Sequence, residues 1–414
     1  MGRLAVKGGS PAAKDLLKLV PPWPTYGEKE KQALIEVLES RRWCRIFPGS
    51  RAELLESVFA EYHHAKHGIA VANGTVALEL ALKTVGVKTG DKVIVPAVTF
   101  IASASAATEL GAIPVFADVD AETGNISPRS VREILGREDG VKAVVAVHYG
   151  GNPVNFDELR PLLAKRGVKL IEDCAHAHGS EWRGRRVGAI GDMGGFSFQE
   201  SKSLTAGEGG IVLTDSDEYA NKARLIHNIG RVVGRPGYEH YILSSNYRMT
   251  EFQAALLLAK IDELKEQVEK KHRNGAYLAD RLRKIGGVEP QKMEEGVTKR
   301  GYYYFVFRYD AEEFGGVPKR RFVEALRAEG VPVDVGYGMP LYKQKAFSRE
   351  AFLEVMPAGT EYPDYDKMHL PGAEEFTKRE VTLLHYYLLG EREALDLIAA
   401  AIEKIKENIG ELAA

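Results

Sequence analysis

The spacing of apolar residues predicts two amphipathic helices near the start of the chain. Helical spacing is found over residues 28–39 and again over residues 51–62. Residues 43–50, which lie between them, contain a Pro-Gly pair and are predicted to form a loop. Residues 1–22 lead into Pro21-Pro22-Trp23-Pro24 and are expected to form a loosely held arm.

From residue 68 onward, short apolar runs alternate with helical stretches. The runs of strand length are residues 69–72, 93–96, 114–117, 141–147 and 169–172. These runs are apolar throughout rather than at every second position, which is typical of strands in a parallel sheet covered on both faces. The pattern therefore predicts an α/β domain.

The second half of the chain begins with a long predicted helix. Thr250 and Gln253 have the spacing of a capping box, and helical character continues to about residue 282. Coiled-coil pairing is the alternative explanation, but sustained heptads are lacking, so we interpret the helix as a connector between domains. A second alternating region follows, with predicted strands at residues 302–308 and 332–335 and helices at residues 319–329 and 393–409.

Length and pattern together predict an α/β protein with two domains. A chain of 414 residues is long for a single core. We expect an N-terminal arm and helix at residues 1–50 and a large domain at residues 51–265, in which helices cover a mainly parallel central sheet. A smaller C-terminal α/β domain is expected at residues 266–414.

The charge balance limits the classes of partner. The 56 basic and 58 acidic residues leave a formal charge of -2 without long runs of one sign, so neither a nucleic-acid nor a membrane-surface partner is expected. The basic stretches 183–186 and 319–321 are interpreted as solvent-exposed.

Cysteine usage and the N-terminal residues indicate a cytoplasmic protein. The two cysteines, Cys44 and Cys174, stand in unrelated contexts and favour a reducing compartment over a disulfide scaffold. Cys174 is interpreted as a small core residue. Residues 1–10 lack the apolar core of a signal peptide, and no apolar run is long enough to span a bilayer.

Lys202 is the residue that we single out as the reactive group. It lies in the middle of Phe-Ser-Phe-Gln-Glu-Ser-Lys-Ser-Leu-Thr-Ala-Gly-Glu-Gly-Gly, residues 196–210. An amine packed among aromatic and small residues loses hydration, which favours its neutral, nucleophilic form. The Ser197 hydroxyl and the backbone amides of the glycines can form a phosphate cradle. An isolated lysine would be interpreted as a surface residue, so the assignment depends on these surroundings.

Two further segments place polar groups at the carboxyl ends of predicted strands. Asn73-Gly74-Thr75 leads into a helix at residues 76–85, whose first amides can bind an anion, unless Thr75 only caps the helix. Asp173 follows the apolar run 169–172, where a carboxylate meets a ligand, unless it only caps the next turn.

Six short motifs occur in a characteristic order. They are Asn-Gly-Thr at 73–75, Thr-Phe at 99–100, Glu-Asp-Cys-Ala-His at 172–176, Ser-Phe-Gln-x-x-Lys at 197–202, Gly-Glu-Gly-Gly at 207–210 and Asn-Tyr-Arg-Met-Thr-Glu at 246–251. Together they resemble the DegT/DnrJ/StrS aminotransferases, fold type I enzymes that use pyridoxal 5'-phosphate. The resemblance runs from about Trp23 to the C-terminal helix.

The resemblance implies a role for each matching residue around the cofactor. Lys202 corresponds to the lysine that forms the Schiff base, and Asp173 to the carboxylate that keeps the pyridine nitrogen protonated, which makes the ring an electron sink. Phe100 corresponds to the aromatic residue stacked on the ring. The phosphate-binding positions correspond to Gly74, Thr75 and Ser197.

Two positions of the resemblance carry further implications. His176 stands near the ring hydroxyl, where many relatives have Gln. Asn246 corresponds to an asparagine that reaches into the neighbouring subunit's site to contact the phosphate, which implies a homodimer with shared active sites.

The activity implied is amino transfer from glutamine or glutamate to a keto sugar or a keto-cyclitol such as scyllo-inosose, with ping-pong kinetics. Residues 199–202 and 385–390 look more like the cyclitol and aminohydroxybenzoate branch than the nucleotide-sugar branch. One alternative is the sugar dehydrase of the same superfamily, in which His replaces the lysine, so Lys202 argues against it. The other is a regulatory protein that binds the cofactor without turnover.

The remaining polar residues add no second kind of site. His148, Asp173, His176 and His178 lack a zinc-site pattern, so no metal is expected. The absence of Gly-x-Gly-x-x-Gly after the first strand argues against a nicotinamide dehydrogenase. His63, His64 and His67 are interpreted as surface residues.

Substrate specificity is expected in the loops 231–241 and 336–345. Five polar residues in or near these loops have no assigned role: Arg231, Tyr238, His240, Arg248 and Tyr342.

Overall fold

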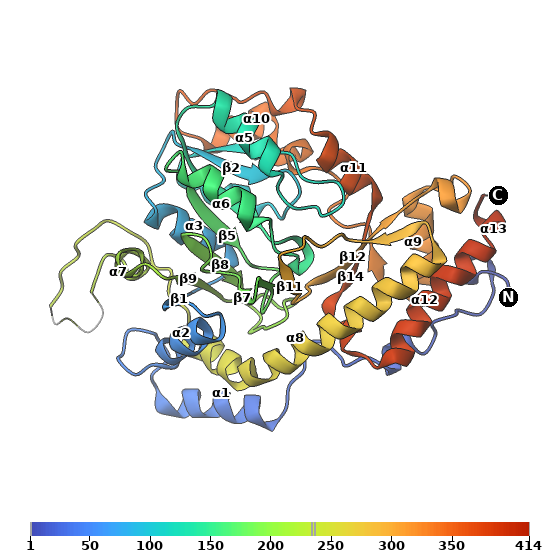
Figure 1. Ribbon diagram of the computed structural model, residues 1–414. Coiled ribbons are helices and arrows are strands. Elements are labelled where there is room, and N and C mark those ends of the chain that lie inside the picture. The colour runs from blue at the N-terminus through green and yellow to red at the C-terminus, as the bar shows by residue number, and fades with distance from the viewer. Residues whose placement is uncertain (1, 233–234, 236, 414) are drawn as a thin grey trace.

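The protein, described by a computed structural model for residues 2–232, 235 and 237–413, is built on a seven-stranded sheet (Figure 1). Its strand order is β1-β9-β8-β5-β4-β2-β3. The strands are β1 (His67–Val71), β2 (Lys92–Pro96), β3 (Ile113–Ala117), β4 (Val141–Val147), β5 (Lys169–Asp173), β8 (Met193–Ser197) and β9 (Gly210–Thr214). Of these seven, β9 runs antiparallel to its neighbours, and the other pairs are parallel. The mainly parallel sheet expected from the apolar runs is confirmed.

Helices bury both faces of this sheet, which explains why the strands are apolar throughout. Successive residues of a strand point to opposite faces, and Val145 lies in one hydrophobic cluster while Val144 and Ala146 lie in another. The first cluster includes residues of α3 (Gly74–Thr84), α4 (Ala102–Thr108) and α7 (Asp217–His227). The second includes residues of α2 (Arg51–Tyr62), α5 (Pro128–Arg137) and α6 (Phe156–Ala164).

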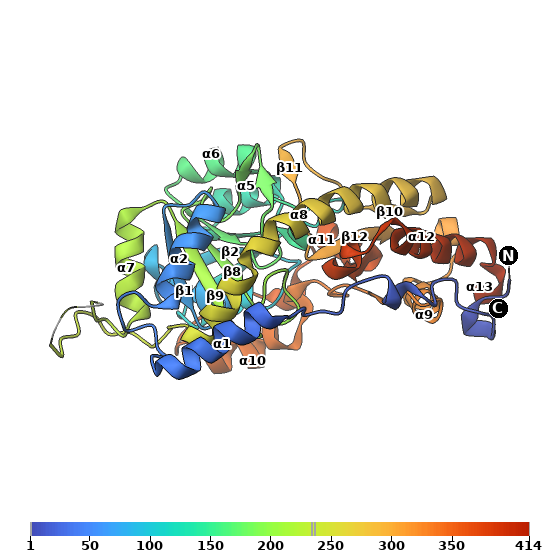
Figure 2. The same ribbon diagram turned by 90° about the horizontal axis from the view of Figure 1, so that it is seen from below.

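Helix α8 (Glu251–Ile285) passes along both parts of the molecule (Figures 1 and 2). Its predicted capping box is present: the Gln253 amide donates to Thr250 Oγ1 and the Thr250 amide donates to Gln253 Oε1. At 35 residues it is about 50 Å long. It packs on α1 (Glu28–Ser40) and α2 near its start and on α12 (Arg392–Glu407) further along. Among the described helices, none combines the length and the apolarity needed to cross a membrane.

The second sheet is antiparallel and has the order β10-β12-β14-β13. Its strands are β10 (Val288–Pro290), β12 (Tyr304–Tyr309), β13 (Val333–Asp334) and β14 (Glu380–Leu384), with α9 (Lys319–Ala328) and α12 packed nearby. The sequence pattern did not reveal β14, although it pairs with two neighbours. It directly follows α11 (Pro371–Arg379) without a turn residue and begins with a charged residue, so the usual strand signals are missing. A small third sheet joins β11 (Val297–Lys299), β6 (Glu181–Trp182) and β7 (Arg185–Arg186).

The N-terminal arm is firmly packed, so the expectation that residues 1–22 are loosely held is wrong. Leu4 and Leu16 are fully buried in the core that also holds C-terminal residues. The amides of Ala5 and Ala12 each donate to the Glu329 carboxylate at 2.8 Å. The arm makes its contacts through single residues in short turns rather than through a periodic face. The sequence pattern therefore did not predict that the arm is packed. Both termini lie beside α13 (Gly410–Ala413) in the two views (Figures 1 and 2).

A C-terminal segment returns to the large sheet. Residues 341–376, which include α10 (Arg349–Val355), contribute Phe347 and Phe376 to the hydrophobic cluster around Phe116 of β3. The Tyr365 hydroxyl donates to the Pro114 carbonyl at 2.6 Å. The domain boundaries at residues 50 and 265 stay a prediction, but chain segments on both sides of them share hydrophobic cores.

Two residues expected at the surface are covered: Lys319 is half-buried and His63 is fully buried. The Lys319 ammonium donates to three backbone carbonyls, and burial lowers its pKa, so the solvent-exposed interpretation of this lysine is wrong. His63 packs against Phe59 and Phe196. His64 is exposed, as expected, and Cys174 is confirmed as a core residue.

Candidate active site

A cavity of about 720 Å³ gathers seven of the eight predicted cofactor residues. Each lies at or shortly after the carboxyl end of a strand of the large sheet, where parallel sheets bind ligands. These residues are Gly74, Thr75, Phe100, Asp173, His176, Ser197 and Lys202. The eighth, Asn246, does not line the cavity.

Lys202 lies in the loop between β8 and β9. Its amide donates to the Gln199 carbonyl at 2.8 Å, and its Nζ lies 3.9 Å from the centre of the Tyr303 ring. Burial lowers the pKa of Lys202, while Tyr303 and Asp173 act in the opposite direction. The lowered pKa enlarges the neutral fraction of the amine, as a nucleophile toward a carbonyl requires.

A fully buried lysine of α8, Lys271, connects this loop to the segment that carries Tyr303. Its Nζ donates to Ser203 Oγ at 2.8 Å and to the Tyr302 carbonyl at 3.0 Å. Burial lowers the pKa of Lys271 to about 7. Lys271 therefore ties the residue after Lys202 to the segment that carries Tyr303.

Asp173 ends β5 and is oriented by two hydrogen bonds. Ser103 Oγ donates to Oδ2 at 2.7 Å, and the Ala175 amide donates to Oδ1 at 3.1 Å. Ser103 also contacts Thr99 Oγ1 at 2.7 Å. The sequence analysis missed Ser103 because it lies in an alanine-rich helix, α4, without a motif of its own.

His176 is a neutral ring stacked on Tyr303. The ring centroids are 4.3 Å apart, and the planes are tilted by 24°. Burial lowers the pKa of His176 well below its usual value. The Gly150 amide donates to Nδ1 at 3.4 Å, which assigns the proton to Nε2 and leaves an N–H donor.

The start of α3 forms an anion-binding cradle. Asn73, rather than Thr75, caps the helix, because Asn73 Oδ1 accepts from the Val76 amide at 2.9 Å. The amides of Gly74 and Thr75 occupy the first helical positions and have no acceptor within the helix. A Cβ on Gly74 would lie 2.5 Å from the Ser197 Cβ, so only glycine lets the Ser197 hydroxyl approach the helix start.

These groups together suit a phosphorylated aromatic aldehyde. Backbone amides, two hydroxyls and the positive end of a helix dipole favour a phosphate. The acid, Asp173, and the amine, Lys202, line the same cavity, and Phe100, a residue that is 58% exposed, contributes an aromatic ring to it.

Three tyrosines complete the cavity wall and were not predicted from the sequence. They are Tyr303, Tyr304 and Tyr337. The run Gly-Tyr-Tyr-Tyr-Phe at residues 301–305 was an available signal for the first two. The Tyr303 hydroxyl contacts Ser201 Oγ at 2.8 Å, beside Lys202.

The loops expected to carry specificity contribute differently. In the loop 336–345, Tyr337 lines the cavity, whereas Tyr342 is 3% exposed and its hydroxyl donates to Glu374 at 2.7 Å. The loop 231–241 lies partly outside the described residues, and its Tyr238 is 86% exposed. His240 Nδ1 contacts the Ile229 carbonyl.

Asn246 is exposed on the surface of the protein. Its Oδ1 accepts from the Arg248 amide at 3.2 Å, and Arg248 donates to Asn228. Its proposed contact with a neighbouring subunit's phosphate stays a prediction.

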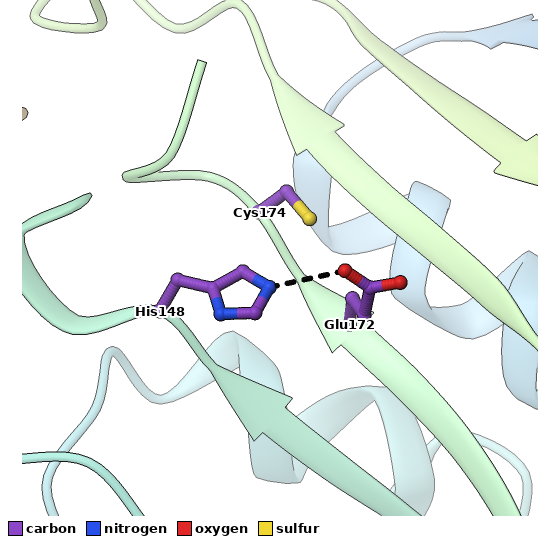
Figure 3. Close-up of side chains that lie close together, drawn as sticks. All are labelled: His148, Glu172 and Cys174. Atoms are coloured by element: carbon purple, nitrogen blue, oxygen red, sulfur yellow. Dashed lines mark hydrogen bonds and ion pairs between the residues drawn. The ribbon is translucent and has the colours of Figure 1, made fainter. Parts of the chain in front are cut away.

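The other polar cluster near the sheet edge consists of His148, Glu172 and Cys174 (Figure 3). Their ligand-type atoms lie within 4.8 Å of one another. The Glu172 carboxylate accepts from three backbone amides of residues 188–191 and from His148 Nε2. His148 Nδ1 in turn accepts from the Val154 amide.

The hydrogen bonds of this cluster leave little capacity for a metal ion. Burial raises the pKa of the Cys174 thiol well above its usual value, which disfavours the thiolate that a metal needs. The carboxylate and the imidazole already use their acceptors. The cluster therefore stabilises the loop 188–191, and the expectation that the protein holds no metal stays a prediction.

Comparisons with known proteins agree with this geometry. The family model for the DegT/DnrJ/EryC1/StrS aminotransferase family matches residues 24–402. L-glutamine:2-deoxy-scyllo-inosose aminotransferase of Streptoalloteichus tenebrarius is 37% identical over 431 residues, covering 99% of both chains.

Two solved structures share the whole fold. One is 3-amino-5-hydroxybenzoic acid synthase, at 35% identity and a TM-score of 0.83, covering 93% of this chain and 98% of that chain. The other is DesV of S. venezuelae in complex with a ketimine intermediate, at 29% identity and a TM-score of 0.79, covering 92% and 95%. The resemblance seen in the six motifs is thus confirmed, and the chain belongs to the DegT/DnrJ/EryC1/StrS aminotransferase family.

Proposed function

We propose that this aminotransferase binds pyridoxal 5'-phosphate and transfers an amino group from L-glutamine to a keto-cyclitol of the scyllo-inosose type. The observation that carries the proposal is the half-buried Lys202, with a lowered pKa, in one cavity with Asp173 and the anion cradle. The named activity of the relative from Streptoalloteichus tenebrarius supports the choice of substrates.

The chain's own residues would hold the cofactor in a defined orientation. The amides of Gly74 and Thr75 and the Ser197 hydroxyl would bind its phosphate. Asp173, fixed by Ser103, would accept the ring N–H, and Phe100 would cover one face. When bound, the cofactor supplies an aldehyde that captures an amine and a ring that takes up electrons.

Lys202 would serve as both the anchor and the proton carrier. Once its amine is free, Nζ can take the proton from the carbon that bears the donor's amino group. In the second half-reaction, it can return a proton to the carbon that receives the amino group. Donor and acceptor use one cavity in turn, so ping-pong kinetics are expected.

The charges in the cavity favour a cyclitol over a nucleotide sugar. Among the described residues that line it, Lys202 is the only lysine or arginine. A diphosphate would need further cationic or amide donors, which a neutral polyhydroxylated ring does not. The hydroxyls of Tyr303, Tyr304 and Tyr337 and the polar groups of Gln199 and Glu208 offer hydrogen bonds to such a ring.

The proposal is tested by assaying the purified protein with each donor and acceptor class. Glutamine and glutamate are combined with 2-deoxy-scyllo-inosose, scyllo-inosose and a keto nucleotide sugar, and the amine product is measured. Lys202→Ala should abolish both the imine absorbance and transfer while the protein stays folded, whereas Lys165→Ala, at an exposed lysine, should change neither. A protein that binds the cofactor but transfers no amine would support the regulatory alternative.

We also propose a homodimer with shared active sites, since Asn246 is exposed and lies outside its own subunit's cavity. Mixing Lys202→Ala subunits with Asn246→Ala subunits would then create dimers with one intact site. About a quarter of wild-type activity should return after random reassociation. No recovery would contradict the sharing. A cytoplasmic location and the lack of nucleic-acid and membrane partners stay predictions.

A further inference from the structure

A fully buried carboxyl group, Glu380, lies directly behind the substrate cavity. It begins β14, and its Oε2 accepts from the Tyr149 hydroxyl at 2.5 Å. Its Oε1 accepts from the amides of Tyr337 at 3.0 Å and Gly338 at 3.4 Å. One side chain thus joins the second sheet, the loop 336–338 and the turn that follows β4.

Two of the three residues that donate to this carboxyl group, Tyr337 and Tyr149, connect it to the cavity. Tyr337 itself lines the cavity. The Tyr149 ring packs edge-on against Tyr337, with centroids 5.8 Å apart, and lies 6.0 Å from the His176 ring. Displacing the carboxyl group would therefore free Tyr337 to move and so change the shape of the cavity wall.

The loop is held at its ends, where Lys319 Nζ donates to the Val335 carbonyl and the Leu341 amide donates to the Ala97 carbonyl, and Glu380 holds its middle. Gly336 and Gly338 flank Tyr337 and have φ angles of 70° and 73°, in the left-handed region. A Gly-Tyr-Gly segment has high conformational entropy, so a defined position for Tyr337 needs an external anchor. A Cβ on Gly336 would lie 2.2 Å from the Glu380 carboxyl carbon, so the loop and this carboxyl group are packed in direct contact.

We propose that Glu380 is a positioning residue that fixes Tyr337 and thereby shapes the cavity in which the substrates bind. The inference rests on the proposed function, because it assumes that the cavity receives the amino donor and the keto acceptor. It assigns Glu380 no contact with either substrate. Its effect is expected in substrate affinity rather than in the rate of proton transfer.

The surroundings of Glu380 make this anchor sensitive to pH. Burial raises its pKa to about 7, while Tyr149, Lys319 and the two amides act in the opposite direction. Tyr304 and Asp334 are further titratable groups near it. The charged groups beside it are otherwise paired: Arg308, opposite Glu380 on β12, contacts Glu122, and Arg327 contacts Asp334.

Protonation changes what the carboxyl group can hold. The ionised form accepts from Tyr149 and from both amides at once. Protonation of Oε2 reverses the hydrogen bond with the Tyr149 hydroxyl and removes the negative charge that strengthens the two amide hydrogen bonds to Oε1. The anchor therefore weakens as the pH falls through about 7, and the KM for substrate should rise.

The first test measures the loop directly and needs no catalytic activity. Hydrogen exchange by mass spectrometry follows the segment 335–339 in the wild type, in Glu380→Ala and in Glu375→Ala, which removes a half-buried carboxylate of α11. Exchange in this segment should be about 10-fold faster in Glu380→Ala, since two buried amides lose their acceptor, and unchanged in the control. Equal exchange in all three proteins would overturn the proposal.

The second test separates affinity from chemistry. Glu380→Gln has no charge at any pH and so resembles the protonated carboxyl group, because its amide oxygen accepts from both backbone amides without charge assistance. At pH 6 and at pH 8 alike, the variant should therefore have the KM that the wild type has at pH 6. Glu380→Ala should raise the KM about 10-fold with kcat changed less than about 2-fold. A loss confined to kcat, or a Gln variant with the wild-type pH profile, would contradict the positioning role.

The two tests also distinguish this inference from the proposed function. If the wild type transfers no amine, the proposed function fails, while hydrogen exchange still decides whether Glu380 anchors the loop. If Glu380→Ala does not fold, Tyr149→Phe removes one partner of the same carboxyl group and should accelerate exchange in the segment 335–339 to a smaller degree. Unchanged exchange in Tyr149→Phe would then count against the network.

Discussion

Glu172 and Asp173 are consecutive buried carboxylates at the end of β5, yet they have different tasks. A carboxylate offers about four acceptor positions. Glu172 accepts from three backbone amides and one imidazole, whereas Asp173 accepts from one hydroxyl and one amide and lines the cavity. Burial of a charge therefore does not identify an active site by itself. Here the active-site residue is identified by its unused acceptor positions beside a cavity, which Asp173 has and Glu172 lacks.

The largest predicted effect is a loss of stability when Glu172, the carboxylate with a structural task, is removed. Glu172→Ala leaves three buried amides and His148 without their acceptor and should lower the free energy of unfolding by about 3–5 kcal/mol. Denaturant unfolding of this variant and of Asp139→Ala, at an exposed site, measures the difference. Folded Glu172→Ala protein should keep its activity per molecule. Unchanged stability would show that the hydrogen bonds contribute little.

Asp173→Asn tests the second carboxylate of the pair, the one that lines the cavity. The amide has the same shape but no charge to keep a ring nitrogen protonated, so amine transfer should fall by about 10²-fold or more, roughly 3 kcal/mol. Stability should change little, because the Asn oxygen can still accept from the Ala175 amide while the Ser103 hydroxyl turns to accept from the new NH2 group and donates to Thr99 Oγ1. Steady-state rates with saturating cofactor measure the loss. A variant within about 2-fold of the wild type would remove Asp173 from the mechanism.

Glu380 is a third buried carboxyl group, and its folded-state pKa of about 7 lies above the usual 4.5. Between these values the unfolded chain has lost the proton that the folded protein keeps, so stability falls as the pH rises. Above about pH 7 the loss in the free energy of unfolding is complete and amounts to about 3 kcal/mol. The stability of Glu380→Gln relative to the wild type should therefore rise between pH 4.5 and 8. A constant difference in melting temperature over this range would contradict the raised pKa.

Ser103→Ala should have the smallest effect of the four. It removes one hydrogen bond to Asp173 and leaves the carboxylate freer to rotate, so kcat/KM should fall about 5- to 10-fold, roughly 1 kcal/mol. Ser105→Ala on the same helix, α4, is the matched control and should be near the wild type. Equal activity of both variants would mean that the Ala175 amide alone orients Asp173.

Local patterns predicted most of the fold and of the cofactor cradle. The capping box at Thr250, the apolar runs of the large sheet and the Gly74 motif depend on neighbours within a few residues, and the structure contains each of them. The arm and β14 were missed for the opposite reason. Leu4 and Leu16 are buried by residues far along the chain, and β14 has the length of a strand without the turn that usually announces one.

The sequence by itself determined which residues can do the chemistry, because an amine, a carboxylate and a glycine-led helix start are written in short motifs around Lys202, Asp173 and Gly74. Only the tertiary structure showed how Glu172 is used and which tyrosines form the cavity wall. Tyr149 and Glu380 are 231 residues apart and meet because two sheets pack together. Such contacts depend on strand order and register, which no local pattern encodes.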